Sequence, residues 1–302
     1  MALITVVVVA ATAAGLASAY RWPGGASATA QRGLTVALYS LVPFVAFVNL
    51  ARLELTVDVG VGIGLSYGAL AAVGVVAWFV ADHLLGLSPA QTGALICVVI
   101  VVNSAYLGYP ATVAILGGDA LPQAVAFDVL VAAPMLLVGA FAVGAAFGTS
   151  ATGTRARLLS FFSRNPPLIA AAAGLLAPES LAPQALVDAS YVIVIALLPL
   201  GFWAVGVTLG EQSGPGRLRL PPALSAPVAV AMVLRLAVAP GLLALAAAPL
   251  IDLPDPYLLL AAMPTGINSL IVAHAYGLDR QLVASTIFWS TAVALVGAVI
   301  LA

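Results

Sequence analysis

Apolar residues run along the chain in long blocks, which short segments containing polar residues, proline or glycine separate. The blocks are roughly 17–25 residues long, the length that a helix needs to cross the hydrocarbon core of a bilayer. Patterns of about ten alternating residues, which mark a transmembrane β-barrel, are missing. The pattern therefore predicts an all-α integral membrane protein with ten transmembrane helices, near residues 2–20, 34–51, 60–81, 91–116, 122–147, 166–178, 186–210, 223–248, 256–276 and 281–301.

The composition supports a membrane protein. Hydrophobic residues make up 63% of the chain and charged residues 7%, with a mean hydropathy of +1.18. A soluble domain carries about 25% charged residues, so a soluble class is excluded. The single cysteine, Cys97, falls within a predicted span and indicates neither a disulfide nor a metal cluster.

The distribution of positive charge predicts an orientation. All ten basic residues are arginine, and eight of them fall in the first, fifth, seventh and ninth predicted loops. Short loops rich in arginine stay in the cytoplasm. We therefore expect a multi-pass protein of the plasma (inner) membrane with both termini extracellular or periplasmic. Because Arg21 follows the first apolar run and no positive charge precedes it, this run is expected to be a retained helix rather than a signal peptide.

The two halves of the chain resemble each other. "LVPFVAF" (41–47) is similar to "LLPLGFW" (197–203), and "ILGGDALPQAVAFDVL" (115–130) to "AYGLDRQLVASTIFW" (275–289). With five spans in each half, the second copy must be inserted upside down, as in the inverted repeats of secondary transporters. We expect a first repeat at 1–147, a cytoplasmic linker at 148–165 and a second repeat at 166–302.

The fourth and ninth spans contain helix-breaking residues where a membrane helix is usually featureless. The fourth span reads "NSAYLGYP" (103–110) and the ninth "PTGINS" (264–269). Proline removes a backbone donor, and the backbone groups that a break exposes must meet protein or a wet cavity rather than lipid. A pair of interrupted helices in equivalent positions indicates a substrate site at the bilayer midplane. Ordinary proline kinks are the alternative.

At these residues the chain resembles the auxin efflux carrier family, which includes the plant PIN carriers. "NSAYLGYP" is similar to the family run N-[TS]-x-[FY]-L-G-x-P, and "NPPLIAAAAGLL" (165–176) to the segment that opens the family's second half. The chain departs from the plant carriers in lacking a second Asn and a Pro at the start of the fourth-helix element and in lacking their long cytoplasmic loop.

The resemblance implies ten helices in two inverted halves, a fold related to the bile-acid sodium symporters. It implies a scaffold of helices 1, 2, 6 and 7, a transport core of helices 3–5 and 8–10, and a crossing of helices 4 and 9 at the substrate site. Together with the residue pattern, it makes these residues candidates for substrate binding: Asn103, Ser104, Tyr109 and Pro110 on one crossover, and Pro264, Thr265, Asn268 and Ser269 on the other.

Ionisable residues inside predicted spans are rare here, and such residues are usually functional or paired. Asp128 lies in the fifth span and Arg235 in the eighth, so they are expected either to form a buried ion pair or to serve coupling and substrate binding separately. In the second case Asp128 would carry a proton or sodium, and Arg235 would be the counter-charge for an anion. His274, near the end of the ninth span, is either a packing residue or a proton relay.

These features predict a secondary transporter that moves a small organic anion by elevator-type alternating access. A sodium-coupled symporter of the bile-acid type and a channel are the alternatives. An intramembrane aspartyl protease is disfavoured, because "LGGD" (116–119) has Leu116 where G-x-G-D requires glycine. No enzyme activity, cofactor or nucleic-acid partner is expected, apart from Na⁺ or H⁺ as a coupling ion. The expected partners are the anion, the lipid bilayer and, by analogy, a second copy in a homodimer.

Overall fold

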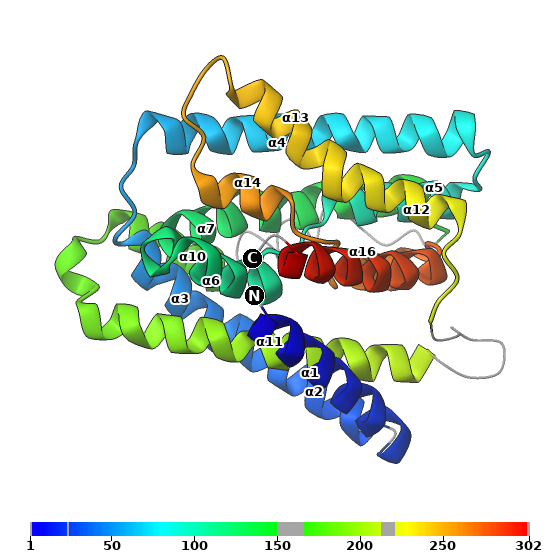
Figure 1. Ribbon diagram of the computed structural model, residues 1–302, viewed down its shortest axis with the longest axis horizontal. Helices are drawn as coiled ribbons and strands as arrows, with labels where there is room; N and C mark the ends of the chain where they lie inside the picture. The colour runs from blue at the N-terminus through cyan, green and yellow to red at the C-terminus, as the bar shows by residue number, and fades with distance from the viewer. Residues whose placement is uncertain (1, 23, 150–165, 213–220, 301–302) are drawn as a thin grey trace.

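The computed structural model describes residues 2–22, 24–149, 166–212 and 221–300, and this part of the chain is helical (Figure 1). The described residues contain no β-strand, although one isolated antiparallel bridge joins Val102 to Thr265. Six helical runs are long and apolar enough to cross a membrane: Leu3–Arg21, Gly25–Leu50, Val57–Leu84, Gly118–Phe147, Gln184–Glu211 and Ala226–Ala247. The predicted all-α membrane protein is confirmed.

The first half contains α1 (Ala2–Arg21), α2 (Gly25–Val36), α3 (Val42–Leu50), α4 (Val57–Phe79), α5 (Pro89–Ile100), α6 (Tyr109–Leu116), α7 (Leu121–Phe127) and α8 (Phe141–Phe147). Several are extended or joined by π-helical turns, namely η1 (Ala37–Leu41), η2 (Val80–Leu84), η3 (Ser104–Gly108), η5 (Asp128–Ala132) and η6 (Met135–Ala140). Arg32 was expected in the first loop, but it lies on α2, because the second helix begins well before residue 34.

The second half contains α10 (Pro166–Leu176), α11 (Gln184–Gln212), α12 (Ala226–Val233), η8 (Leu234–Val238), α13 (Ala239–Ala247), α14 (Asp255–Ala261), α15 (Ser269–Tyr276) and α16 (Arg280–Ile300). Most of the predicted linker 148–165 lies outside the described residues, as do five of the loop arginines, Arg155, Arg157, Arg164, Arg217 and Arg219.

The helices form two groups that share an interface. In the first group α1 packs along α11, α2 also packs on α11, and α3 packs on α10. In the second group α4 packs on α5 and α13, and α16 packs on α5, α12 and α15. Figure 1 shows α1, α2 and α11 along the lower edge and α4 and α13 along the upper edge. The shorter segments η3, α6 and α7 lie between the groups and contact α3 or α11.

Glycines bring α1 and α11 into backbone contact. A Cβ atom added at Gly206 would lie 2.0 Å from the Thr12 carbonyl oxygen, and one added at Gly15 would lie 2.0 Å from the Trp203 carbonyl oxygen. Small residues allow membrane helices to approach closely, which increases van der Waals packing and weak Cα–H···O contacts. These contacts matter within a bilayer, because the hydrophobic effect contributes little to the association of helices there. Gly206 and Gly210 form the G-x-x-x-G pattern on α11.

We expect Gly206→Ala to lower the thermal unfolding temperature of the purified protein, because its methyl group must push α1 away from α11. Overpacking of this kind costs about 1–3 kcal/mol. Gly64→Ala is the matched control, since a Cβ at Gly64 on α4 meets nothing within 4 Å. An unchanged melting temperature for Gly206→Ala would contradict the close contact between the two helices.

Candidate functional site

The two predicted interruptions lie side by side at the centre of the fold. The first falls at residues 101–103, between α5 and η3, and the second at residues 262–268, between α14 and α15. The backbone N–H of Asn103 donates to the Pro264 carbonyl over 2.9 Å, and the N–H of Gly266 donates to the Val101 carbonyl over 2.9 Å. Two stretches 160 residues apart therefore satisfy each other's exposed peptide groups by pairing as a short antiparallel ladder. We call this pairing the crossing.

Gly266 makes this approach possible. A Cβ atom at this position would lie 2.6 Å from the Val102 carbonyl oxygen, which belongs to the other segment of the crossing. Real Cβ atoms do not approach an oxygen so closely, and the atom in the way is backbone and cannot rotate aside. The glycine in "PTGINS" is thus required by contact between the two interruptions, rather than by a turn within its own helix.

The position of the first break corrects the sequence interpretation. Pro110 was expected to interrupt the fourth span, but it is the second residue of α6 and is buried in continuous helix. The preceding turn η3 is π-helical, and proline is well tolerated near the start of a helical segment. Pro264 does lie in its interruption, where its carbonyl accepts from Asn103.

Donors from outside α5 satisfy its last carbonyl groups. The Thr265 hydroxyl donates to the Val98 carbonyl over 2.8 Å, and the Thr265 backbone N–H bonds the Ser290 hydroxyl at 3.2 Å. The Ser269 hydroxyl, at the first residue of α15, donates to the Gly266 carbonyl of the interruption over 2.7 Å. The predicted residues Thr265 and Ser269 therefore hold the crossing together from within the protein, and both side chains are buried.

Arg235 reaches the crossing from η8. Its Nε donates to the Met263 carbonyl over 3.0 Å, its Nη1 to the Val99 carbonyl over 2.9 Å, and its Nη2 to the Ala261 carbonyl. The side chain is fully buried. Among the described residues Arg235 makes no ion pair within 4.0 Å, so the structure does not bring it together with Asp128 as a salt bridge.

Asp128 instead accepts hydrogen bonds from two hydroxyl groups. Ser104 Oγ donates to its Oδ1, and Tyr109 Oη donates to its Oδ2 over 2.6 Å. Asp128 begins the π-helical turn η5, and Ser104 is the first residue after the break in the fourth span. Of the two alternatives, the ion pair with Arg235 is not formed, because each charge has other polar partners: carbonyl groups for Arg235 and hydroxyl groups for Asp128.

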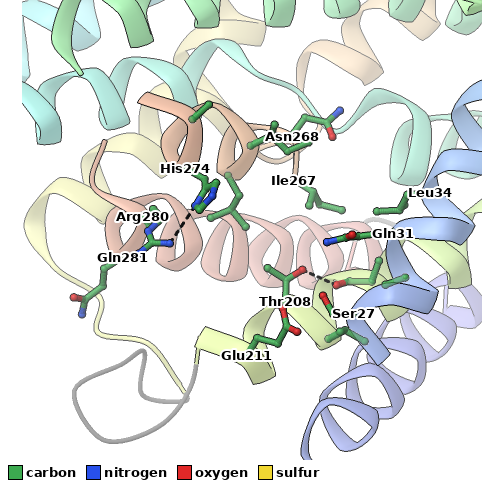
Figure 2. A pocket seen from close by; sticks show the side chains of 16 residues that line it. Ser27, Gln31, Leu34, Thr208, Glu211, Ile267, Asn268, His274, Arg280 and Gln281 are labelled. Atoms are coloured by element: carbon green, nitrogen blue, oxygen red, sulfur yellow. Dashed lines mark hydrogen bonds between the residues drawn. The ribbon is translucent and has the colours of Figure 1, made fainter. Parts of the chain in front are cut away.

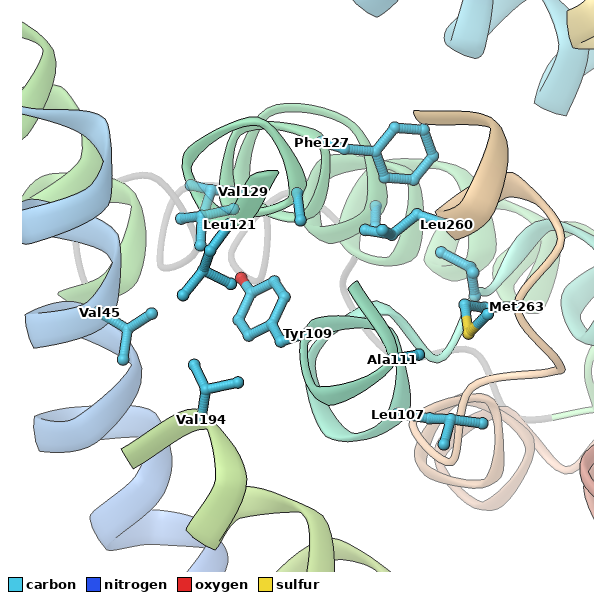
Figure 3. Close-up of a cluster of buried hydrophobic side chains, with 14 of the residues drawn as sticks. Val45, Leu107, Tyr109, Ala111, Leu121, Phe127, Val129, Val194, Leu260 and Met263 are labelled. Carbon is cyan, nitrogen blue, oxygen red and sulfur yellow. The ribbon is translucent and has the colours of Figure 1, made fainter. Parts of the chain in front are cut away.

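Tyr109 is anchored in the largest hydrophobic cluster. Figure 3 shows its ring among side chains of α3, α7 and α11, including Val45, Leu121 and Val194. The ring is fully buried, so its hydroxyl is held beside Asp128 by packing as well as by the hydrogen bond. Tyr109 was a candidate for substrate binding, and the structure places its ring in the core.

Asn103 is 3% exposed, and its side-chain Nδ2 has no hydrogen-bond partner in the described part of the chain. A buried amide without a partner costs about 1–3 kcal/mol. Such a donor at the crossing is suited to an acceptor that arrives with a ligand.

A cavity of about 840 Å³ opens next to the crossing, between the two helix groups (Figure 2). α2 and α11 form one wall, and α15 with the start of α16 forms the other. Asn268, at the N-terminal end of α15, is exposed to it, and His274 lies one to two turns further along. Its polar lining consists of Ser27, Gln31, Thr208, Glu211, Asn268, His274, Arg280 and Gln281.

The opposite end of the cavity from Asn268 holds charged side chains. His274 Nδ1 and Arg280 Nη1 lie 3.3 Å apart, and Glu211 lies on the α11 wall (Figure 2). Sequence reasoning named Asn268 and His274 but missed Gln31, Thr208 and Arg280. The spacing of Ala204, Thr208 and Glu211 on α11 puts them on one helix face, and this was the available signal for a polar stripe.

Comparisons with known proteins agree with the motifs. Residues 163–302 match the family described as membrane transport protein. An uncharacterized transporter of Methanocaldococcus jannaschii, MJ1031, is 26% identical over 231 residues, which cover 72% of this chain and 70% of that protein. The predicted family resemblance is confirmed. The matched half includes the α14–α15 interruption and most of the residues that line the cavity. Through residues 163–302, the chain is similar to the membrane transport protein family.

Proposed function

We propose that this protein is a secondary transporter whose substrate is a small organic anion and whose binding site is the cavity at Asn268. The observation that supports this most directly is the position of the cavity. It lies between two packed helix groups and ends at the crossing of two interrupted helices. Paired interruptions of this kind form the midplane sites of known secondary transporters.

The chemistry of the inner end of the cavity favours an anion. The first turn of α15 presents its N-terminal end there, which carries a partial positive charge. Asn268 adds an exposed amide that can donate to a carboxylate, and Arg280 adds a positive charge further out. A carboxylate that enters from the Arg280 end would meet this positive charge, with Glu211 on the α11 wall, before it reaches the N-terminal end of α15.

The architecture that fits this function is the ten-span inverted repeat, with halves 1–147 and 166–302. The first helix group corresponds to the expected scaffold and the second to the expected transport core. An elevator movement would slide the second group along α2 and α11, the helices that form one cavity wall. The lining of the cavity includes Ser27, Glu211 and Arg280, which stand next to the first, seventh and ninth loops, on the side where the arginines were expected to gather. By the positive-inside rule this side is cytoplasmic, so the termini face the exterior of the plasma membrane.

Coupling of transport to a proton is assigned to Asp128. Its carboxylate holds Ser104, the residue that follows the break, so a change in its charge would alter a contact at the crossing itself. His274 is exposed to the cavity and contacts Arg280, which suits a role at the cavity entrance rather than in a buried relay. A homodimer through the first helix group remains compatible with this arrangement.

We expect Asn268→Ala to abolish the stabilisation of the protein by its substrate while leaving the melting temperature of the ligand-free protein unchanged. Asn268 is exposed, and no side-chain hydrogen bond of Asn268 is present in the described residues, so its loss removes a ligand contact rather than a fold contact. The measurement is a thermal-shift screen of small carboxylic acids, with Gln281→Ala as a control on the rim of the cavity.

Transport itself is tested in proteoliposomes loaded with the acid that gives the largest thermal shift. A carrier shows saturable counterflow of the labelled acid, and Asn268→Ala should reduce it. Flux that never saturates would indicate a channel instead. Undiminished ligand stabilisation in Asn268→Ala and in Asn103→Ala would remove the site from the crossing.

A further inference from the structure

Two helices end at the crossing, and their C-terminal ends converge. The last turn of α5 presents the Val99 carbonyl, and α14 ends with the Ala261 carbonyl, followed by that of Met263. The C-terminal end of a helix carries a partial negative charge, and no water is available to unpaired carbonyls within a bilayer. This arrangement requires a positive group. In transporters with interrupted helices, such carbonyls commonly coordinate the coupling cation.

In this chain the positive group is part of the protein. The three hydrogen bonds of Arg235 go to these three carbonyls, one on the α5 side and two on the α14 side. A planar guanidinium presents donors in several directions at once, so one side chain can join the ends of two helices. Arg235 is fully buried, and it is not among the residues that line the cavity. Within the described ranges no carboxylate pairs with Arg235 and it does not line the cavity, which leaves the helix ends as its counter-charge.

We propose that Arg235 is a positioning residue whose guanidinium is a permanent cation at the crossing, in the place where a transported or coupling cation would otherwise bind the helix ends. The role of this cation in coupling rests on the proposed transport function. Its presence at the helix ends does not, and it can be tested without any substrate. The proposal excludes sodium from these carbonyls as long as Arg235 occupies them.

The test is thermal unfolding of the full-length protein in detergent without substrate, in sodium chloride and in choline chloride. We expect the melting temperature of the wild type to be the same in both salts. Arg235→Ala should melt at a lower temperature in choline. It should regain stability on titration with sodium or with guanidinium at low millimolar concentration, because either cation can enter the vacated position. Arg32→Ala removes the same side chain from an exposed position on α2 and should show neither change.

Arg235→Lys provides the second variant. An ammonium group keeps the charge but is a single point, so it cannot serve three separate carbonyls. We expect this variant to melt below the wild type in both salts, and to show no saturable response to sodium because a cation is already present. If Arg235→Ala cannot be purified, this variant and the wild type carry the test.

A saturable rise in the melting temperature of the wild type with sodium would overturn the proposal, because it would place a sodium site beside an intact Arg235. Arg235→Lys with wild-type stability, or Arg235→Ala with no response to guanidinium or sodium, would overturn it as well. If the proposal holds while the transport function fails, the cation responses remain and proteoliposome counterflow is absent. If the transport function holds and only the proposal for Arg235 fails, proteoliposome counterflow is present, but sodium and guanidinium do not stabilise Arg235→Ala.

Discussion

Replacing Gly266 with valine is expected to abolish transport and to lower the melting temperature more than any other single change proposed for this protein. Even the Cβ atom would lie 2.6 Å from the Val102 carbonyl oxygen, so the two segments of the crossing must separate. Separation breaks the Gly266–Val101 and Asn103–Pro264 hydrogen bonds, both 2.9 Å long. Buried backbone groups that lose their partners cost about 1–3 kcal/mol each, and within a bilayer water does not replace them.

Gly241→Val on α13 and Gly266→Ala complete this experiment. A Cβ at Gly241 meets nothing within 4 Å, so valine there introduces a larger side chain in a helix of the same group without a clash. Gly266→Ala tests whether the first methyl group already produces the effect. Melting temperatures in detergent and counterflow in proteoliposomes are the two measurements. Wild-type transport by Gly266→Val would show that the crossing is not needed for function.

Asp128→Ala is expected to give the second-largest loss. The substitution leaves the hydroxyl groups of Ser104 and Tyr109 without the acceptor that they share. Hydrogen bonds to a charged group contribute about 1.5–3 kcal/mol each. Because Ser104 follows the break directly, we expect both a lower melting temperature and a loss of transport.

Asp128→Asn separates the structural role from the coupling role. Asparagine keeps the shape and can still bond both hydroxyls, but it cannot exchange a proton. If Asp128 carries the coupling proton, Asp128→Asn should fold normally, bind the acid in the thermal-shift assay, and lose the acceleration of uptake by a pH gradient. Tyr106 and Tyr109 are the titratable neighbours that interact with Asp128. Tyr106→Phe and Tyr109→Phe are therefore the controls for the effect of the pH gradient on uptake. A gradient effect that persists in Asp128→Asn would assign the proton elsewhere.

The all-helical membrane character, with its six helical runs long enough to cross a bilayer, was predictable from the sequence because long apolar blocks have few alternatives. The interruption at 101–103 begins earlier than the predicted stretch 103–110, which was chosen because it contains proline and glycine. The true break contains Val101 and Val102, two residues with no helix-breaking character. Its cause lies in the partner segment, whose residues Pro264 and Gly266 supply the hydrogen bonds that keep this valine stretch extended.

The candidate site was predictable only in part for a related reason. Asn268 was identified because it stands beside helix breakers within its own span. The hydrogen-bond partners of Asp128 and Arg235 were not identified, because both side chains bond to groups that are distant in sequence. The partners of Arg235 are backbone carbonyls, which every residue possesses, so no residue type marks them. Two opposite charges within the membrane suggested an ion pair as one alternative. Nothing in the sequence favoured hydroxyl partners for Asp128 or carbonyl partners for Arg235 over that pair.

The crossing is built mainly from peptide atoms. Its stability therefore depends on other groups than the side chains that line the cavity. Ile267 and Asn268 project into the cavity, while the ladder beside them depends on main-chain groups of Val101, Asn103 and Pro264. Side-chain substitutions at Ile267 and Asn268 are therefore expected to change the cavity wall without breaking the hydrogen bonds of the crossing. Under the proposed transport function, a search for variants with altered substrate selectivity would begin with Ile267 and Asn268.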